Sequence, residues 1–445
     1  MRVDSVMKIL FIYANKDHKH TLITKIKCKL NSGPMLTLQY LAAITPKKHE
    51  IELVDDRYDA PDYNSDADLV GISTVTASAN RAYEIADKFK NKGKKIVMGG
   101  VHPSALPHEA LKHADSIVIG EAEKVWLTVL DDCENNNLKP IYKADSFIDM
   151  KKMPPPRHEL IKVNPIISSV VTSRGCPYNC SFCSITHLFG KTYRPRPIKE
   201  IINEIKANPR KNFVLHHDSS LVLDKAYARA LFKAMIPLKI HFIGFGNVPV
   251  LLKDEELLKL SREAGCVNWG IGFETFNKKS IQKDAEKKYN IDDYKRLVKK
   301  IHKYEMSVFG TFVFGFDHDN ADVFETTTEN VFDLGIDSAE FNILTPFPIS
   351  RLFKTLDEQG RILTYDWKKY DFHHVVFEPK NMSKDNLYNG CKKISKKFYS
   401  PLKTLNRLVN VPLRSKSFIE FIAVASLNAN EYFFQREYDL FSREK

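Results

Sequence analysis

The stretch IISSVVTSRGCPYNCSFC, residues 166–183, joins a short apolar run to a loop that holds three cysteines. Residues 166–173 are few and rich in β-branched side chains, which is typical of a buried β-strand. Cys176, Cys180 and Cys183 follow at once, with three and then two residues between them. Barrel enzymes place active-site residues on the loops that follow their strands. The stretch therefore predicts the first strand of a parallel barrel and a functional site at its end.

The number and spacing of these cysteines indicate an iron–sulfur cluster. Structural zinc takes four ligands, commonly from two C-x2-C pairs, and the chain has no second pair. Three thiolates suit a [4Fe–4S] cubane whose fourth iron stays open to a ligand. Two alternatives remain: a fourth ligand from elsewhere would give zinc or a closed cluster, and the three thiols could share a loop by chance. The other cysteines occur singly, at Cys28, Cys133, Cys266 and Cys391.

Further apolar runs follow the cysteine loop at regular intervals, with helical patterns in most of the gaps. Six strand–helix units over about 180 residues favour a closed or partial parallel barrel, which we expect over residues 165–350. The remaining predicted strands are 212–218, 240–246, 267–274, 307–315 and 339–345.

The first 135 residues predict a separate doubly wound α/β domain. Short continuous apolar runs alternate with helix-period segments, the pattern of a parallel sheet covered on both faces. Asparagines and Met153-Pro154-Pro155-Pro156 then indicate a linker over 136–164. The predicted strands of this domain are 8–14, 51–56, 68–74, 95–100 and 116–121.

Composition and charge exclude several classes of protein. The chain has 445 residues, 43% of them hydrophobic and 27% charged, which is neither disordered nor fibrous. Seven cysteines are too few for a disulfide scaffold and indicate a reducing compartment. No apolar run is long enough to span a membrane, so we expect a cytoplasmic protein.

The positive charge is concentrated near the C-terminus. Lys+Arg exceed Asp+Glu by 67 to 55, and residues 351–445 alone hold 18 against 11. Residues 380–416 hold ten basic side chains and one acidic one, Asp385. We expect 351–445 to be a basic, mostly helical region. The charge of this region is compatible with an anionic lipid surface, so the protein is a candidate for peripheral membrane contact. The region carries no RNA-binding motif, which disfavours nucleic acid as a partner.

The cysteine loop, with Phe182 just before the last cysteine, resembles the signature of the radical S-adenosylmethionine (SAM) enzymes. The predicted six-unit barrel is similar to the partial barrel of that family. The resemblance implies that Cys176, Cys180 and Cys183 hold a [4Fe–4S] cluster whose open iron binds the methionine end of SAM. It also implies that reductive cleavage of SAM yields a 5′-deoxyadenosyl radical, with electrons from a donor such as ferredoxin or flavodoxin.

The same resemblance implies which residues contact SAM. Asp218 ends the second strand, where relatives carry an acidic residue near the methionine amino group; a helix N-cap is the alternative role. Gly272 and Glu274 end the fourth strand, and the carboxylate would suit the ribose hydroxyls. The fifth strand resembles the one whose backbone lies along the adenine. The implied SAM contacts are Phe182, Asp218, Gly272, Glu274, Phe314 and Gly315.

The first domain resembles the cobalamin-binding domains that precede some radical SAM barrels. In these domains the corrin lies across the strand ends, and small residues allow the backbone to approach it closely. The axial-histidine pattern Asp-x-His-x-x-Gly is absent from residues 15–21, so His18 and His20 are not expected to bind the metal, and the axial ligand stays open. A degenerate domain kept for structure is the alternative. The implied cobalamin contacts are Ser73, Thr74, Gly99, Gly100, His102, Gly120 and Glu121.

Residues 344–348, 356–362 and 366–377 resemble a subgroup that includes the hopanoid C-2 methylases. We therefore expect a cobalamin-dependent radical SAM enzyme that methylates an unactivated carbon of a small-molecule or lipid substrate. Two alternatives remain open: a cyclisation or rearrangement without methyl transfer, and a cobalamin-binding protein without catalytic activity.

Overall fold

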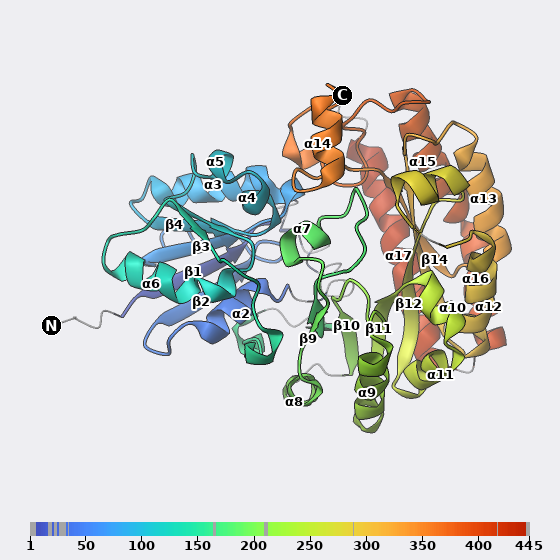
Figure 1. Cartoon of the computed structure of the whole chain (residues 1–445), viewed down its shortest axis with the longest axis horizontal. Helices are drawn as coiled ribbons and strands as arrows, with labels where there is room; N and C mark the ends of the chain where they lie inside the picture. Colours follow the sequence, from blue (N-terminus) through green and yellow to red (C-terminus); the bar gives the residue numbers. More distant parts are fainter. Residues whose placement is uncertain are drawn as a thin grey trace.

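The computed structural model describes residues 6–16, 20–21, 25, 33, 35–162, 166–208, 212–287, 289–415 and 417–441, with side chains of the last helix described to residue 429. Two parallel sheets lie side by side, and the C-terminal helices cover the second one (Figure 1). Cys28 and His18 lie outside the described residues.

The first sheet has six parallel strands in the order β2-β1-β3-β4-β5-β6, which confirms the doubly wound domain. The strand order reverses between β1 and β3, the point where open α/β sheets bind ligands. The strands are β1 (Lys8–Tyr13), β2 (Glu50–Asp55), β3 (Leu69–Ser73), β4 (Lys95–Gly99), β5 (Ser116–Ile119) and β6 (Ile141–Lys143). The helices are α2 (Thr37–Ile44), α3 (Ala79–Lys90), α4 (Val101–Ala105), α5 (Pro107–Ala110) and α6 (Trp126–Glu134).

The alternating side chains of β1 show how this sheet is covered. Leu10 and Ile12 pack in a cluster with residues of α3, whereas Ile9 and Phe11 pack with residues of α2 and α6. Both faces are therefore apolar, as a buried parallel sheet requires. Strand β6 pairs with β5 inside the stretch expected to be linker, so the first sheet extends past residue 135.

The second sheet is an incomplete barrel of six parallel strands, in the order β14-β13-β12-β11-β10-β7, and confirms the predicted fold. A short antiparallel pair, β8 with β9, carries the start of the cysteine loop. The strands are β7 (Ser168–Val170), β8 (Ser173–Arg174), β9 (Arg194–Pro195), β10 (Phe213–His216), β11 (His241–Gly246), β12 (Cys266–Glu274), β13 (Ser307–Phe314) and β14 (Ser338–Ile343). Its outer helices include α8 (Ile198–Ala207), α9 (Lys225–Met235), α10 (Val248–Lys253), α11 (Glu255–Glu263), α12 (Asp292–Lys303) and α13 (Val323–Leu334).

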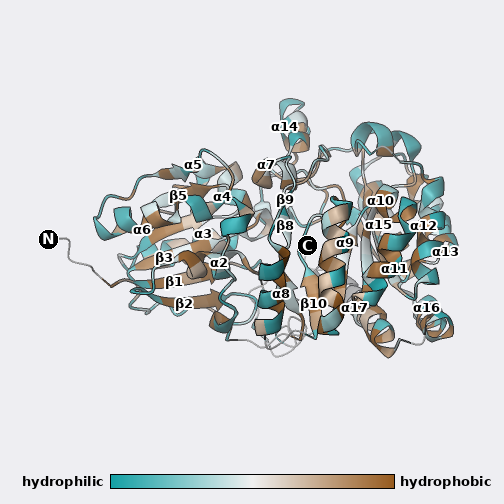
Figure 2. Cartoon of the chain, turned by 60° about the horizontal axis from the view of Figure 1, so that its bottom comes forward, coloured by the Kyte–Doolittle hydropathy of each residue, from teal (hydrophilic) through white to brown (hydrophobic). Residues whose placement is uncertain are grey.

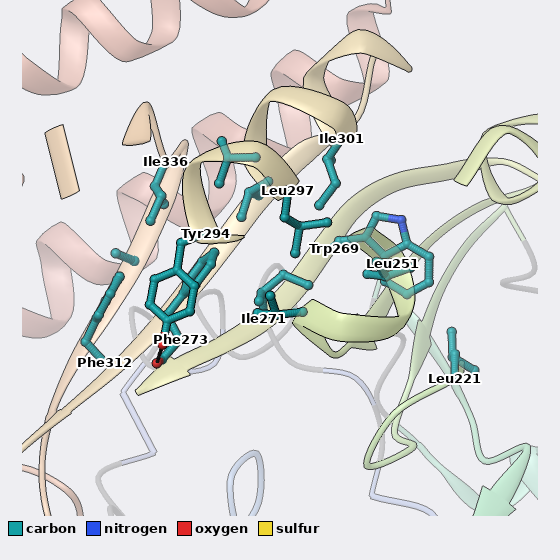
Figure 3. Packing of buried hydrophobic residues seen from close by; sticks show 14 of the residues in the cluster. Leu221, Leu251, Trp269, Ile271, Phe273, Tyr294, Leu297, Ile301, Phe312 and Ile336 are labelled. Atoms are coloured by element: carbon teal, nitrogen blue, oxygen red, sulfur yellow. Dashed lines mark hydrogen bonds between the residues drawn. The ribbon is translucent and has the colours of Figure 1, made fainter. Parts of the chain in front are cut away.

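Strand β12 shows how the two faces of the barrel sheet differ. Trp269, Ile271 and Phe273 are fully buried in the core that β12 shares with α12 (Figure 3). Burial of each such side chain contributes about 1.5–3 kcal/mol. Side chains alternate along a strand, so Gly270 and Gly272 lie on the inner face. The Phe245 ring lies over Gly270, and the Glu274 carboxylate lies over Gly272.

The C-terminal region is helical, with α14 (Arg351–Glu358), α15 (Lys384–Phe398), α16 (Pro401–Arg414) and α17 (Phe418–Phe441). Before α15 the chain returns to the first domain, where Trp367 and Tyr370 join the apolar cluster on the α3 side of the sheet. Helix α15 packs against β14, and the Cys391 thiol donates to the Phe341 carbonyl. None of the helices in the described ranges is long and apolar enough to cross a membrane.

Candidate functional site

The three cysteines lie on the loop between β8 and α7 (Ile185–Phe189), and all three are half-buried. The backbone N–H of Cys176 donates to the Gly190 carbonyl over 3.1 Å, which draws the two ends of the loop together. Gly175 has a φ of +83°, and a Cβ there would lie 2.0 Å from the Thr192 carbonyl oxygen. A glycine is therefore required immediately before the first cysteine.

Further contacts hold the cysteine loop against the end of the barrel. The Ser181 hydroxyl donates to the Asp284 carbonyl over 2.7 Å, and the Ser181 carbonyl accepts from the Leu352 N–H over 2.9 Å. The Phe182 ring lies 5.8 Å from the Phe316 ring, just past β13. The loop is thus fixed at the strand ends, where the sequence predicted the site.

The surroundings of the thiols bear on their charge. Burial raises the pKa of Cys180 to about 11 and also raises the pKa of Cys183, and the negative charge of Cys176 adds to both shifts. A nearby cation would therefore be needed to favour the thiolate forms of Cys180 and Cys183. Across the described residues, no three Cys, His, Asp or Glu side chains converge on a single metal ion. Three thiolates are nevertheless the type of ligand that iron–sulfur clusters take.

Glu274 lies beside this loop in an unusual conformation. Its φ is +66°, a region that non-glycine residues seldom occupy, and its side chain is buried. Its carboxylate forms an ion pair of 3.0 Å with Lys287. A Cβ on Gly272 would lie 2.5 Å from Glu274 Oε1, so the carboxylate folds back over the glycine. Strain at a strand end beside a candidate site is typical of functional positions.

Lys287 was not among the predicted site residues. Burial opposes its charge, but Glu274, Tyr289 and Cys180 together raise the pKa of Lys287 well above its usual value. It therefore places a positive charge beside Cys180, whose negative charge it favours. Nothing in the sequence distinguishes it from the neighbouring lysines.

Asp218 supports the start of the cysteine loop. Its carboxylate accepts from the Thr172 N–H at 3.1 Å, from the Thr172 hydroxyl at 2.8 Å and from the Ser173 hydroxyl at 2.6 Å. The alternative role as a helix N-cap is wrong, because Asp224 caps α9 by accepting from the Tyr227 N–H. The contact of Asp218 with SAM stays a prediction.

At the end of β13, backbone rather than side chains faces the site. The Phe314 ring packs outward, 5.0 Å from the Phe324 ring of α13. Gly315 has a φ of +105°, and its N–H donates to Asp319 over 3.2 Å. Asp319 was not predicted; burial raises its pKa to about 6. This arrangement suits the expected role of the Phe314–Gly315 backbone, which stays a prediction.

A large cavity opens at the carboxyl ends of the first sheet, at the point where the strand order reverses. It encloses about 1140 Å³, open solvent included. Its wall also includes residues of the second domain, namely Ser184, Ile185, Leu188 and Phe189 directly after the last cysteine. Of the predicted cobalamin contacts it is lined by Ser73, Thr74, Gly99, Gly100, Gly120 and Glu121.

Two of the cavity glycines fit close approach of a bulky group. Gly100 has a φ of +104°, and a Cβ there would lie 2.5 Å from the Thr74 carbonyl oxygen. Gly120 has a φ of +80°, and a Cβ there would meet no atom within 4 Å, so it borders open space. The geometry therefore fits the bulky corrin of cobalamin, which the sequence placed at these strand ends.

His102, the remaining predicted cobalamin contact, does not line this cavity. Its buried ring is 3.3 Å from Glu109 Oε1 and packs at 5.0 Å from the Trp367 ring. Helix α4 starts directly after Gly100 and carries the histidine away from the strand ends. The cavity lining contains no histidine among the described residues, which do not include His18.

Two arginines join the cavity to the cysteine loop. Arg174, two residues before Cys176, donates to Glu121 over 3.0 Å and to Glu123 over 2.6 Å. Arg194 donates to both carboxylate oxygens of Glu121, over 2.9 and 3.0 Å. The predicted cobalamin contact Glu121 therefore also ties the two domains together. No role was predicted for the arginines, whose partners lie more than 50 residues away in sequence.

Comparisons with known proteins agree with this arrangement. The radical SAM superfamily model matches residues 170–331, and the B12 binding domain model matches residues 30–130. The bacteriochlorophyllide d C-12(1)-methyltransferase of Chlorobaculum tepidum is 29% identical over 401 residues, covering 87% of each chain. The solved structure of the cobalamin-dependent S-adenosylmethionine radical enzyme OxsB has a TM-score of 0.66 at 15% identity, covering 96% of this chain and 72% of that one.

A second methyltransferase of C. tepidum shows the family to which the chain belongs. The bacteriochlorophyllide d C-8(2)-methyltransferase is 32% identical over 420 residues, which cover 86% of this chain and 92% of that enzyme. Similarity at this level along both chains shows the family. The protein belongs to the cobalamin-dependent radical SAM methyltransferases, whose cofactors are a [4Fe–4S] cluster, SAM and cobalamin.

Proposed function

We propose that the protein methylates an unactivated carbon of a large, mainly apolar small molecule or lipid. The observation that carries this proposal is the shared wall of the two sites: Ser184 and Ile185, immediately after Cys183, line the cavity of the first domain. A substrate between the two sites would lie within reach of both cofactors. When bound, the cluster with SAM supplies hydrogen-atom abstraction, and cobalamin supplies the methyl group.

The residues of the chain would hold and orient the cofactors. Cys176, Cys180 and Cys183 would hold the cluster. Glu274, fixed over Gly272 by Lys287, would accept hydrogen bonds from SAM. The Arg174 bridge to Glu121 and Glu123 would keep the two cofactors at a constant separation. Radical chemistry of this kind needs no separate acid or base, and we assign none.

A second cavity supports the class of substrate. It encloses about 770 Å³, open solvent included, between the two domains. Tyr40 and Val171 extend its apolar wall, and Ser173, His217 and Ser219 add polar groups. The residues it shares with the first cavity are Met35, Thr37, Arg174, Ile185 and Phe189. The apolar part of this lining suits a flat or extended hydrophobic molecule. The named relatives act on bacteriochlorophyllide d, a substrate of this kind.

Anaerobic turnover with SAM deuterated in its methyl group tests this function. The substrates would be a bacteriochlorophyllide-type tetrapyrrole and a polyisoprenoid lipid, assayed separately by mass spectrometry. A product that carries the deuterated methyl group supports the proposal. Turnover of either substrate without deuterium would instead indicate cyclisation or rearrangement, and binding of cobalamin without any SAM cleavage would indicate a non-catalytic protein.

Two partners complete the proposal. The cluster needs an electron donor, and we assign this role to a ferredoxin or flavodoxin. The excess of basic residues in 380–416 supports reversible contact with a membrane surface, from which an apolar substrate would be taken.

A further inference from the structure

Helix α16 presents an apolar face to solvent. Leu402, Leu405, Val409 and Leu413 recur every three or four residues, so they lie on one side of the helix. Their side chains are 82%, 59%, 49% and 78% exposed, respectively. Val411, on the opposite side of the helix, is fully buried. Single exposed leucines are ordinary in globular proteins, but four on one helix face indicate an interaction surface.

The start of α17 extends this surface. Phe418 and Ile422 lie one turn apart and are 71% and 45% exposed. We call the six residues the α16–α17 face: Leu402, Leu405, Val409, Leu413, Phe418 and Ile422. Helix α16 lies at the edge of the molecule farthest from the first sheet, so the face lies well away from the cofactor cavities (Figures 1 and 2).

The inner side of α16 fixes the helix in this orientation. The Arg407 guanidinium lies 3.8 Å from the centre of the Phe398 ring, donates to the Phe398 carbonyl over 2.7 Å and donates to Asn428 over 2.8 Å. Arg414 pairs with Asp337 over 2.7 Å and with Glu420 over 2.9 Å. The leucines therefore cannot turn inward without breaking buried polar contacts.

The charge around the α16–α17 face is positive. Lys403 is exposed on α16, which has no carboxylate, whereas Arg407 and Arg414 lie on its inner side. The adjacent helix α15 adds five lysines against Asp385. The carboxylates that pair with Arg414, Asp337 and Glu420, are both buried. An exposed apolar helix face with basic neighbours is the signature of a helix that lies in the interface of an anionic bilayer. A second copy of the chain would bring the same positive charges together, which disfavours a dimer through this face.

We propose that the α16–α17 face docks on an anionic lipid bilayer, with its apolar side chains inserted between headgroups and acyl chains. This deepens the membrane contact proposed above, because it names the inserting residues. It would hold the enzyme at the surface by apolar insertion as well as by charge.

Flotation of the full-length protein with lipid vesicles tests the proposal without any turnover. We expect binding to vesicles of phosphatidylcholine with phosphatidylglycerol, and weaker binding to phosphatidylcholine alone. The variant L402S/L413S should bind the anionic vesicles about tenfold more weakly, because two inserting side chains are lost. The control V6S/L127S alters two residues that are 59% and 55% exposed outside this face and should bind as the wild type does.

Three results would overturn this proposal: no binding of the wild-type protein to anionic vesicles, equal binding by L402S/L413S, or an equal loss in V6S/L127S. A wild-type dimer that L402S/L413S converts to a monomer, without vesicle binding, would assign the face to a second copy of the chain. Methyl transfer to substrate in detergent should persist in L402S/L413S, so a failure of membrane docking is distinguishable from a failure of the proposed reaction.

Discussion

Arg174 Nη1 donates to Glu121 Oε1 over 3.0 Å across the boundary between the two sheets, two residues before the first cysteine. The side chains of both residues are nearly fully buried. This bond joins the wall of the cobalamin cavity to the loop that would hold the cluster, so one ion-pair network sets the position of both sites.

Replacement of Arg174 by alanine should destabilise the protein strongly. The change leaves Glu121 and Glu123 buried with fewer partners, and breaking a buried pair typically costs about 3–5 kcal/mol. The midpoint of urea unfolding measures the loss. The matched control is Arg157→Ala, which removes an exposed ion pair with Glu159 and should cost less than about 1 kcal/mol. Equal midpoints for the two variants would show that the network contributes nothing.

Gly100→Ala should weaken cobalamin binding while the cluster is retained. The added Cβ would clash with the Thr74 carbonyl at 2.5 Å and distort the cavity wall. Gly93→Ala is the control, because Gly93 has a similar φ of +73° but no atom within 4 Å of the added Cβ. The cobalamin content of each variant, measured by absorption after reconstitution, distinguishes the two. A loss shared by both variants would reflect backbone strain and not the cavity.

Gly272→Ala should reduce the affinity for SAM. The new methyl group would displace the Glu274 carboxylate, whose Oε1 lies 2.5 Å from the Cβ position. Equilibrium binding of SAM to the reconstituted protein measures the effect, and an iron assay checks that the cluster is unchanged. If Gly272→Ala bound SAM with the affinity of the wild-type protein, Glu274 would not be a SAM contact.

Asp319 should make stability depend on pH. Burial raises its folded-state pKa to about 6, above the value near 3.9 expected when unfolded. Its contribution is therefore full below about pH 4 and is lost as the pH rises through about 6. Relative to Asp319→Asn, the wild-type protein should lose about 3 kcal/mol over this range, as followed by urea unfolding at successive pH values. A constant difference would place the folded pKa near its ordinary value.

The fold was largely predictable because its strands are local apolar patterns. Eleven apolar runs correspond to eleven of the strands in the two sheets, from β1 to β14. Strand β6 was missed, since its three residues, Ile141-Tyr142-Lys143, show no such run and acquire their pairing only from β5.

The site was predictable only where its functional residues are neighbours in the sequence. The cysteine loop has a fixed spacing, whereas the Arg174–Glu121 bond joins residues 53 positions apart. The left-handed conformation of Glu274 and its pairing with Lys287 likewise arise from the folded chain. His102 follows a cavity glycine by two residues, but the turn into α4 directs it away from the cavity.

The most direct test of the account is formation of 5′-deoxyadenosine from SAM by anaerobically reconstituted protein with a chemical reductant. The wild-type protein should form it, and a variant with Cys176, Cys180 and Cys183 replaced by alanine should not, while Cys391→Ala should retain the activity. Absence of 5′-deoxyadenosine from wild-type protein that carries a full complement of iron and sulfide would contradict the account.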